Sequence, residues 1–286
     1  MRCKNLIKKT LCFVLASVMM VSSMPATSVD AAKVKKKGWV KEGGYKYYYV
    51  KGKKYTGFRY IEGKTYYFAK KDHAKTPKGS AIKGWHKVQG DYYYFDRTKG
   101  FMERNKKVDG IKLNSDGTAK ETAYNVSKIQ TMMRASKLVR TLTKATDSRK
   151  AKRKKVFTYM TKVPYIGYHF LKNVRDKKDW DIIMANDVLD ENAHATNGGE
   201  CTAMACALGY LLHECGYKTV YITDDDSSLY GDAHSWVEID GKAFDPLFAR
   251  TKGWSNYYNA SYNHNGKGAN LWAINKRDVS TGKDKK

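Results

Sequence analysis

The chain has 286 residues, 42% of them hydrophobic, and a net charge of +26. This length allows one large domain or two modest ones, and the charge favours an anionic partner. Nucleic acid is not the expected partner, because the first residues predict export.

The N-terminus has the pattern of a secretory signal peptide. Four basic residues lead into an apolar run at about 11–24, and Val29 and Ala31 suit a signal peptidase. The run is shorter than the roughly 20 apolar residues that span a bilayer. Removal of residues 1–31 therefore predicts a secreted, extracellular protein without stable membrane insertion.

Charge divides the mature chain into two modules. Residues 32–119 hold 23 Lys and Arg against 8 Asp and Glu, residues 120–181 hold 17 against 5, and residues 182–286 hold 10 against 14. The basic part favours a polyanionic cell envelope, with solubility alone as the alternative. The predicted modules are 32–119 and 120–286.

The first module is repetitive. Gly38, Gly57 and Gly84 each precede an aromatic residue, with another glycine and an aromatic triplet at the same later positions. Each unit predicts a short β-hairpin that must stack on its neighbours. A degenerate fourth unit is expected from Gly110. The candidate wall-binding residues are Trp39, Tyr48, Phe58, Tyr67, Trp85 and Tyr94.

This pattern resembles the cell-wall-binding repeats of Gram-positive surface proteins, whose choline-binding members hold quaternary ammonium groups in aromatic cages. The family usually has Trp before the triplet, where this chain has Lys46, Thr65 and Tyr92. A cage needs ring faces around the cation, and a lysine repels it. The resemblance implies cell-wall association through a glycopolymer or peptidoglycan, and the charge favours an anionic glycopolymer. Alternatively, the rings only hold the hairpins together.

Residues 120–197 predict helices that serve packing. Ser127 is expected to cap a helix to about Leu142, and Ser148 to cap a basic helix. A loop or short strand is expected at 165–173, and another helix at about 186–194.

Residues 198–217, GGECTAMACALGYLLHECGY, predict the most apolar helix of the chain. It is apolar almost all round, so it should be buried, with only its first turn facing a cleft. There the helix dipole favours the thiolate of Cys201, and Gly198 and Gly199 should leave space above the sulfur. Helical spacing places Cys201, Cys206 and Cys215 too far apart or on different faces for a disulfide.

The stretch HSWVEIDGKAFDPLF predicts a β-hairpin with Asp240 and Gly241 as its turn. In that register His234 and Asp245 are diagonal neighbours on one face, while Val237 and Phe244 point to the core. A carboxylate so placed fixes the tautomer of the imidazole. A thiolate with a base and an orienting group is the pattern of nucleophilic catalysis.

The order Cys201, His234, Asp245, within GGEC, HSWVEI and FDP, resembles the transglutaminase-like superfamily of papain-type folds. The resemblance implies an α+β fold, a papain-like or transglutaminase-like catalytic domain in which a central helix packs on an antiparallel sheet, after the N-terminal β-hairpin repeat module. It implies Cys201 as the nucleophile, His234 as the general base and then acid, and Asp245 as the orienting group.

No cofactor and no metal site are expected from the sequence. The acidic run at 224–228 is interpreted as a solvated loop, and His169 and His194 have no recognisable partner pattern.

Two classes of function remain. The first is a wall-associated thiol enzyme that acts on peptide or side-chain amide bonds of a protein or peptide substrate, with water or an amine as acyl acceptor. The second is a non-catalytic adhesion or scaffold protein with the same fold. The Cys201, His234 and Asp245 set favours the enzyme, because a purely structural domain does not need it.

Overall fold

A computed structural model describes residues 35–73, 75–225 and 233–285. The predicted signal peptide lies outside the described residues. Among the described helices, none is both long and apolar enough to span a bilayer. Residues 36–286 form one compact unit.

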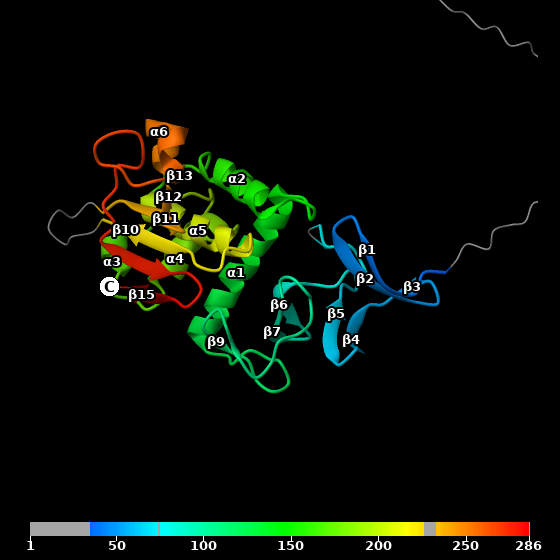
Figure 1. Cartoon of the computed structure of the whole chain (residues 1–286). Helices are drawn as coiled ribbons and strands as arrows, with labels where there is room; N and C mark the ends of the chain where they lie inside the picture. The colour runs from blue at the N-terminus through cyan, green and yellow to red at the C-terminus, as the bar shows by residue number, and fades with distance from the viewer. Residues whose placement is uncertain (1–34, 74, 226–232, 286) are drawn as a thin grey trace, which may run out of the picture. The chain divides into compact units, whose positions relative to one another are not determined.

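The N-terminal part consists of successive β-hairpins (Figure 1). Its strands are β1 (Gly38–Glu42), β2 (Tyr45–Val50), β3 (Lys53–Lys54), β4 (Gly57–Ile61), β5 (Lys64–Phe68), β6 (Gly84–Val88), β7 (Asp91–Phe95), β8 (Lys107–Val108) and β9 (Ile111–Lys112). The pairs β1–β2, β4–β5 and β6–β7 are the three predicted hairpins. Backbone bridges such as Phe68 with Ala81 and Phe95 with Met102 link them to the segments that follow. The prediction of N-terminal hairpins is confirmed.

The fourth unit differs from the prediction. Gly110 does not begin a unit, because with Asp109 it forms the turn between β8 and β9, where both residues have positive φ. Asp-Gly strongly favours a two-residue hairpin turn. This local preference determines the structure here, and the repeat alignment does not.

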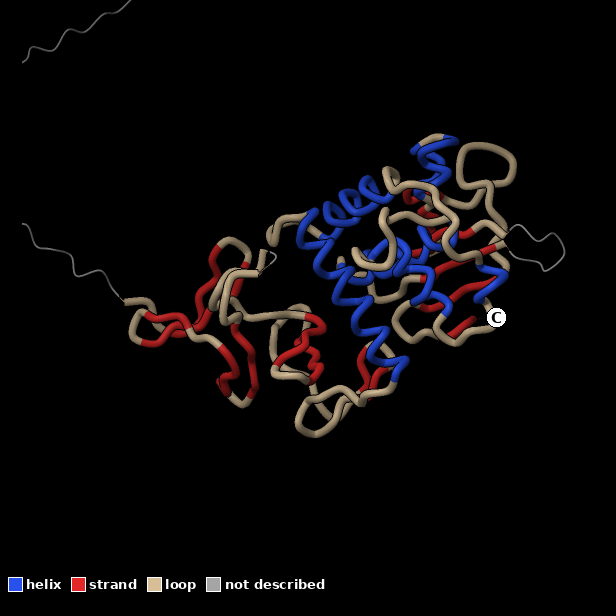
Figure 2. The backbone as a smooth tube through the Cα atoms, turned by 180° about the vertical axis from the view of Figure 1, so that it is seen from behind, coloured by secondary structure: helices blue, strands red, loops and turns tan. Residues whose placement is uncertain are grey.

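The C-terminal part combines helices with an antiparallel sheet (Figure 2). Its elements are α1 (Ala123–Leu142), α2 (Arg149–Met160), α3 (Leu171–Val174), α4 (Trp180–Leu189), α5 (Cys201–Glu214), β10 (Tyr221–Asp224), β11 (Ser235–Ile239), β12 (Lys242–Phe244), α6 (Pro246–Lys252), α7 (Trp254–Tyr257), β13 (Tyr258–Ala260), β14 (Asn275–Asp278) and β15 (Lys283–Lys285). The sheet order is β13-β12-β11-β10-β14-β15, and every pairing is antiparallel. The buried helix α5 contacts β10 and β11 as well as α1 and α4. A mixed α and β fold with an antiparallel sheet is therefore confirmed.

Two helix boundaries differ from the prediction. Helix α1 begins four residues before Ser127, because the Thr122 hydroxyl accepts a hydrogen bond from the Asn125 N–H and caps it. Helix α4 begins at Trp180, because the apolar residues that bury its core face lie before residue 190. Ser148 caps α2 as predicted.

The hairpins and the helical part share a hydrophobic core. Trp85, Tyr94 and Leu113 belong to the same cluster of buried residues as the apolar side chains of α1 and α5. Apolar burial on this scale is the main favourable contribution to folding. The core thus continues across residue 119, where the sequence predicts a module boundary.

Candidate functional site

Cys201 occupies the first position of α5, where the sequence placed it. Glu200 caps the helix, because its Oε2 accepts a hydrogen bond from the Thr202 N–H at 3.1 Å. The same oxygen accepts the thiol of Cys201 at 2.9 Å. The Cys201 residue is 8% exposed, so the thiol lies at the edge of the buried core.

Two glycines let the chain reach α5 through a tightly packed turn. A Cβ on Gly199 would lie 2.4 Å from the Cβ of Ala203, and one on Gly198 would lie 2.8 Å from Cδ1 of Ile166. The Gly199 N–H donates to the Pro164 carbonyl at 3.1 Å. The glycines therefore permit close packing of this turn against Ile166 and Ala203.

The predicted hairpin of β11 and β12 forms in the predicted register. Val237 pairs with Phe244, and Asp240 and Gly241 both have positive φ in the turn. This register brings Nε2 of His234 to 2.6 Å from Oδ2 of Asp245. The diagonal pairing inferred from the sequence thus becomes a direct hydrogen bond.

Asp245 has a second role that the sequence did not indicate. Its Oδ1 accepts the Phe248 N–H at 2.9 Å and caps α6. Phe248 in turn stacks on the imidazole of His234, with ring centroids 3.9 Å apart. The buried carboxylate therefore orients the imidazole and starts the helix whose aromatic side chain covers it.

The face of the hairpin that carries His234, Trp236 and Asp245 is largely buried. Trp236 is fully buried, and its indole N–H donates to the Tyr262 hydroxyl at 2.8 Å. Every residue of β11 is buried, because α5 covers one face and further side chains cover the other. His234, just before the strand, keeps a partly exposed side chain at 14%.

Cys201 lies against the backbone on both sides of His234. Its Sγ is 3.5 Å from the Ala233 carbonyl oxygen, and the same sulfur accepts a hydrogen bond from the Ser235 N–H. A hydrogen bond between the hydroxyls of Thr202 and Ser235, at 2.9 Å, holds α5 to β11. Among the described residues, no hydrogen bond joins the thiol to the imidazole ring. The structure thus joins His234 to Asp245 and places Cys201 beside them with its proton directed to Glu200.

The acidity of the thiol differs from the expectation. Burial raises the pKa of Cys201 above its ordinary value, and the carboxylate of Glu200 raises it further. The Ser235 N–H and the Thr202 side chain act in the opposite direction. The predicted thiolate is therefore not the favoured resting form, because desolvation and a neighbouring negative charge both disfavour it.

The described cysteines Cys201, Cys206 and Cys215 are all free, as the helix geometry predicted. Burial raises the pKa of Cys215 to about 12. Cys206 is fully buried inside α5.

The acidic run after β10 contributes to the site. Oδ1 of Asp225 accepts the His234 N–H at 2.7 Å, and Asp224 is buried in an ion pair with Arg175. The interpretation as a solvated loop is wrong for Asp224, which is buried at the end of β10, whereas Asp225 is half-buried and follows the strand. Residues 226–228 lie outside the described residues. The closeness of Asp224 and Asp225 to His234 depends on the antiparallel pairing of β10 with β11, which local sequence does not reveal.

The six candidate wall-binding aromatic residues form three cross-strand pairs. Trp39 faces Tyr48, Phe58 faces Tyr67, and Trp85 faces Tyr94. Trp85 is 2% exposed, and its indole N–H donates to Asp109 at 2.8 Å. The third pair therefore serves the core, and the wall-binding hypothesis applies to the first two pairs.

The first pair already holds a cation. The ammonium of Lys46 lies 3.8 Å from the ring centroid of Trp39. A cation–π contact of this kind occupies the ring face that a quaternary ammonium ligand would need. The geometry agrees with the sequence argument against a choline cage at this position.

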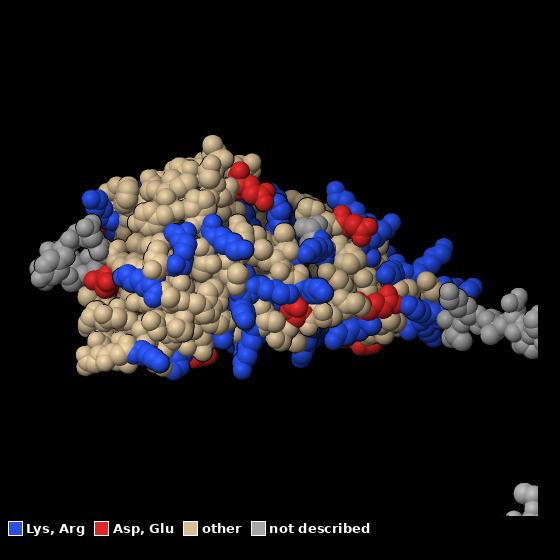
Figure 3. Space-filling model, turned by 90° about the horizontal axis from the view of Figure 1, so that it is seen from above, with Lys and Arg blue, Asp and Glu red and all other residues tan. Residues whose placement is uncertain are grey.

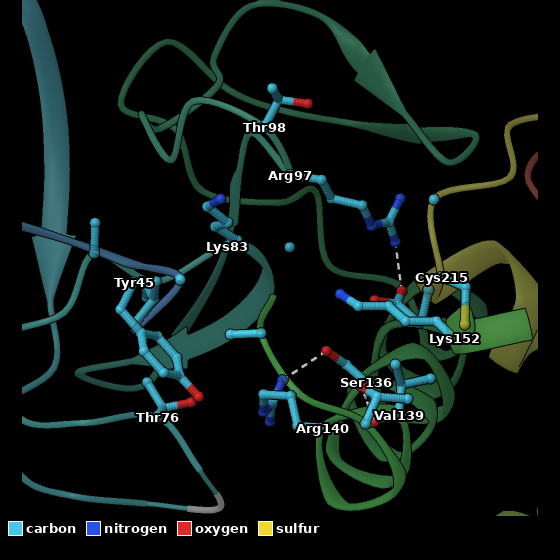
Figure 4. Close-up of a pocket in the computed structure, with 18 of the residues that line it drawn as sticks. Tyr45, Thr76, Lys83, Arg97, Thr98, Ser136, Val139, Arg140, Lys152 and Cys215 are labelled. Atoms are coloured by element: carbon cyan, nitrogen blue, oxygen red, sulfur yellow. Dashed lines mark hydrogen bonds and ion pairs between the residues drawn. The ribbon is translucent and has the colours of Figure 1, made fainter. Parts of the chain in front are cut away.

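A basic cavity lies between the hairpins and the helices (Figure 4). Its volume is about 360 Å³, and its basic side chains come from Lys46, Lys83, Arg97, Arg140 and Lys152. Burial lowers the pKa of Lys83, and Lys152 and Lys46 lower it further. Arg97 forms an ion pair with Glu214. The lysines thus repel one another in a partly desolvated space that an anion would stabilise.

Comparisons with known proteins cover only part of the chain. No family model and no curated protein matches it. Choline binding protein F from Streptococcus pneumoniae is 31% identical over 30% of this chain and 28% of that chain, with a TM-score of 0.26. CbpJ from Streptococcus pneumoniae TIGR4 is 26% identical over 30% and 28%, also with a TM-score of 0.26. The choline binding domain of Spr1274 in Streptococcus pneumoniae is 28% identical over 31% of this chain and 99% of that chain, with a TM-score of 0.27.

This chain therefore spans less than a third of the length of the first two proteins. Two of the three are named for choline binding.

Proposed function

We propose that this chain is a secreted, wall-associated thiol enzyme of the transglutaminase-like, papain-type class, which acts on amide bonds through Cys201, His234 and Asp245. The observation that carries the proposal is the hydrogen bond between Nε2 of His234 and Oδ2 of Asp245, beside a thiol at a helix N-terminus. A base, its orienting carboxylate and a nucleophile within one small region match the requirements of covalent catalysis.

The carboxylate determines which nitrogen acts as the base. Because Asp245 accepts a hydrogen bond from Nε2–H, the neutral imidazole has its lone pair on Nδ1. Nδ1 takes the thiol proton as Sγ attacks the carbonyl carbon of the amide, and the C–N bond then breaks as Nδ1–H protonates the leaving amine. The product is a thioester on Cys201.

A second acyl transfer regenerates the thiol. Water or an amine loses a proton to Nδ1 and attacks the thioester carbonyl, and the proton then returns to the departing sulfur. The backbone N–H of Cys201, in the first turn of α5, supplies a donor for the oxyanion. The buried Asp245 stabilises the imidazolium formed in each step.

The resting thiol must change its partner before this chemistry. In the structure it donates to Glu200, so substrate binding has to favour rotation of the thiol toward Nδ1. The Cys201 sulfur already contacts the Ala233 carbonyl and the Ser235 N–H, the backbone groups on either side of His234.

The hairpins would hold the enzyme at the wall. The basic surface of the N-terminal part (Figure 3) and the cavity of Lys46, Lys83 and Lys152 both favour an anionic glycopolymer. The Lys46 ammonium over Trp39 disfavours a quaternary ammonium ligand there.

Mass spectrometry of a peptide and wall-fragment library tests the enzyme. Incubation with the protein should produce cleaved or cross-linked products that its Cys201→Ala variant does not produce. Cys215→Ala is the matched control, because it removes a buried thiol outside the site. Equal product patterns from the protein and from Cys201→Ala would favour the alternative, a non-catalytic adhesion or scaffold protein.

Sedimentation with purified Gram-positive walls tests the attachment. Binding should weaken as salt rises, because exposed charges are screened over roughly 8–10 Å at physiological ionic strength. Salt-independent binding that free choline displaces would instead support an aromatic cage.

A further inference from the structure

A cluster of three side chains with metal-binding atoms lies outside the Cys201 site. Nδ1 of His169 is 2.8 Å and Nε2 of His194 is 2.9 Å from the same oxygen, Oδ1 of Asp187. All three ligand atoms lie within 4.8 Å of one another. The residues come from the loop before α3, from α4 and from the turn after α4. Folding therefore brings together groups that the sequence left without a pattern.

The surrounding structure holds this cluster in place. Asp187 has a side chain that is only 2% exposed. The ring of Tyr168 stacks on His194 with centroids 3.6 Å apart, and the Tyr168 hydroxyl donates to the Thr196 carbonyl at 2.8 Å. Preorganised ligands of this kind bind a metal with little loss of side-chain freedom.

We propose that His169, Asp187 and His194 form a zinc site. Two imidazole nitrogens and one carboxylate oxygen are a ligand set that zinc takes, whereas calcium and magnesium prefer oxygen ligands alone. Zinc bonds of about 2.0–2.2 Å in a tetrahedral site separate neighbouring ligand atoms by about 3.4 Å. The present N–O separations of 2.8 and 2.9 Å need to widen by only about half an ångström. Zinc binds the neutral imidazole, so the proton on the nitrogen that faces Asp187 moves through solvent to the other nitrogen of each ring, and water completes the tetrahedron.

The position of the site would let a bound metal connect three segments of the chain. The backbone N–H of Gly198 donates to the backbone carbonyl of Asp187 at 3.2 Å, and Gly199 pairs with Pro164. Zinc would therefore tie the loop of His169, helix α4 and the segment that leads into Cys201 to one another. This inference does not depend on the proposed enzymatic activity.

Isothermal titration calorimetry of the untagged, chelator-treated chain with Zn²⁺ alone tests the proposal. We expect one zinc per chain. His169→Ala and His194→Ala should each weaken binding by more than about 100-fold, because loss of even an outer-shell partner costs 10–100-fold. His264→Ala is the matched control, since this exposed histidine stacks on Trp272 away from the cluster, and its affinity should equal that of the unchanged protein.

A second measurement separates a lost site from a lost fold. Circular dichroism without metal should be the same for the protein and for His169→Ala, whose histidine side chain is 40% exposed. Added zinc should raise the melting temperature of the protein but not of the His169→Ala, His194→Ala double variant. Cys201→Ala should bind zinc normally, because the thiol is not a ligand. Absence of zinc binding by the unchanged protein, full binding by the double variant, or loss of binding in Cys201→Ala would each overturn the proposal.

Discussion

Substitution of Asp245 by Asn separates the two roles of this carboxylate. Its Oδ1 accepts the Phe248 N–H, and its Oδ2 accepts Nε2–H of His234. Asparagine has one acceptor oxygen and one donor nitrogen. If the oxygen keeps the cap, the NH₂ group faces Nε2 and forces the imidazole proton onto Nδ1. Nδ1 can then no longer take the thiol proton.

The structure predicts different losses of unfolding free energy for Asp245→Asn and Asp245→Ala. Asn and Asp are about equal as helix caps, and the tautomer exchange preserves a hydrogen bond, so Asp245→Asn should lower the free energy of unfolding by less than about 1 kcal/mol. Asp245→Ala loses the cap, about 1 kcal/mol, and leaves the Nε2–H of the partly buried imidazole without its partner, about 1–3 kcal/mol. At roughly 2–4 °C per kcal/mol, Asp245→Ala should melt roughly 5–15 °C lower.

Asp245→Asn should reduce the catalytic rate strongly, although it reduces stability only a little. A comparable carboxylate-to-amide change in a serine protease triad costs about 10⁴ in rate, and Asp245→Asn should cost a similar factor here. Combining it with His234→Ala should add little, because residues that act as a unit are not additive.

Nitrogen NMR reports the tautomer of the His234 imidazole, and thermal melts report the stability of each variant. Turnover of any substrate found by mass spectrometry reports the activity. The protein should show the Nε2–H tautomer of His234, and Asp245→Asn the Nδ1–H tautomer. The reasoning is refuted if Asp245→Asn keeps the Nε2–H tautomer with full turnover, or if it destabilises the fold as much as Asp245→Ala.

Two further predictions concern titration. The rate of Cys201 alkylation by iodoacetamide should keep rising above pH 9, because burial and Glu200 raise the pKa of the thiol. Glu200→Gln should accelerate the alkylation at pH 8, whereas the control Glu191→Gln, at an exposed residue, should not. A rate that reaches a plateau near neutral pH would contradict this prediction. Burial lowers the pKa of Lys128 to about 8 from 10.5, so the unfolded chain binds more protons between these values and stability rises with pH across that window. The difference in unfolding free energy between the unchanged protein and Lys128→Met should therefore change by about 3 kcal/mol in favour of the unchanged protein from pH 7 to 10.5. A pH-independent difference in denaturant titrations would refute this.

The elements with strong local signals could be predicted from the sequence. Asp240-Gly241 fixes the hairpin register, and this register determines which residue faces His234. The continuous apolar run after Cys201 predicts the buried helix in the same way. In both cases a short stretch of chain contains the whole physical cause.

Features that depend on distant pairing could not be predicted. Asp225 reaches the His234 N–H only because β10 pairs with β11. The metal-binding atoms of His169 and His194 meet at Asp187 through the packing of a loop and a turn on α4, and no standard ligand spacing indicates them. Trp85 has the same repeat position as Trp39, yet it is buried because helices cover the third hairpin.

Glu200 connects the stability of the site to its chemistry. Ser, Thr, Asp and Asn are the preferred helix caps, and one oxygen of Glu200 is buried without a hydrogen-bond partner among the described residues, which costs about 1–3 kcal/mol. Helix stability alone would therefore select a different residue. Glutamate can reach the thiol of the next residue and hold its proton. Because the thiolate is the form that oxidants attack, a neutral resting thiol would protect this free cysteine in the oxidising environment that the predicted export implies. Under the proposed mechanism, its conversion to a nucleophile would wait until substrate favours rotation of the thiol toward His234.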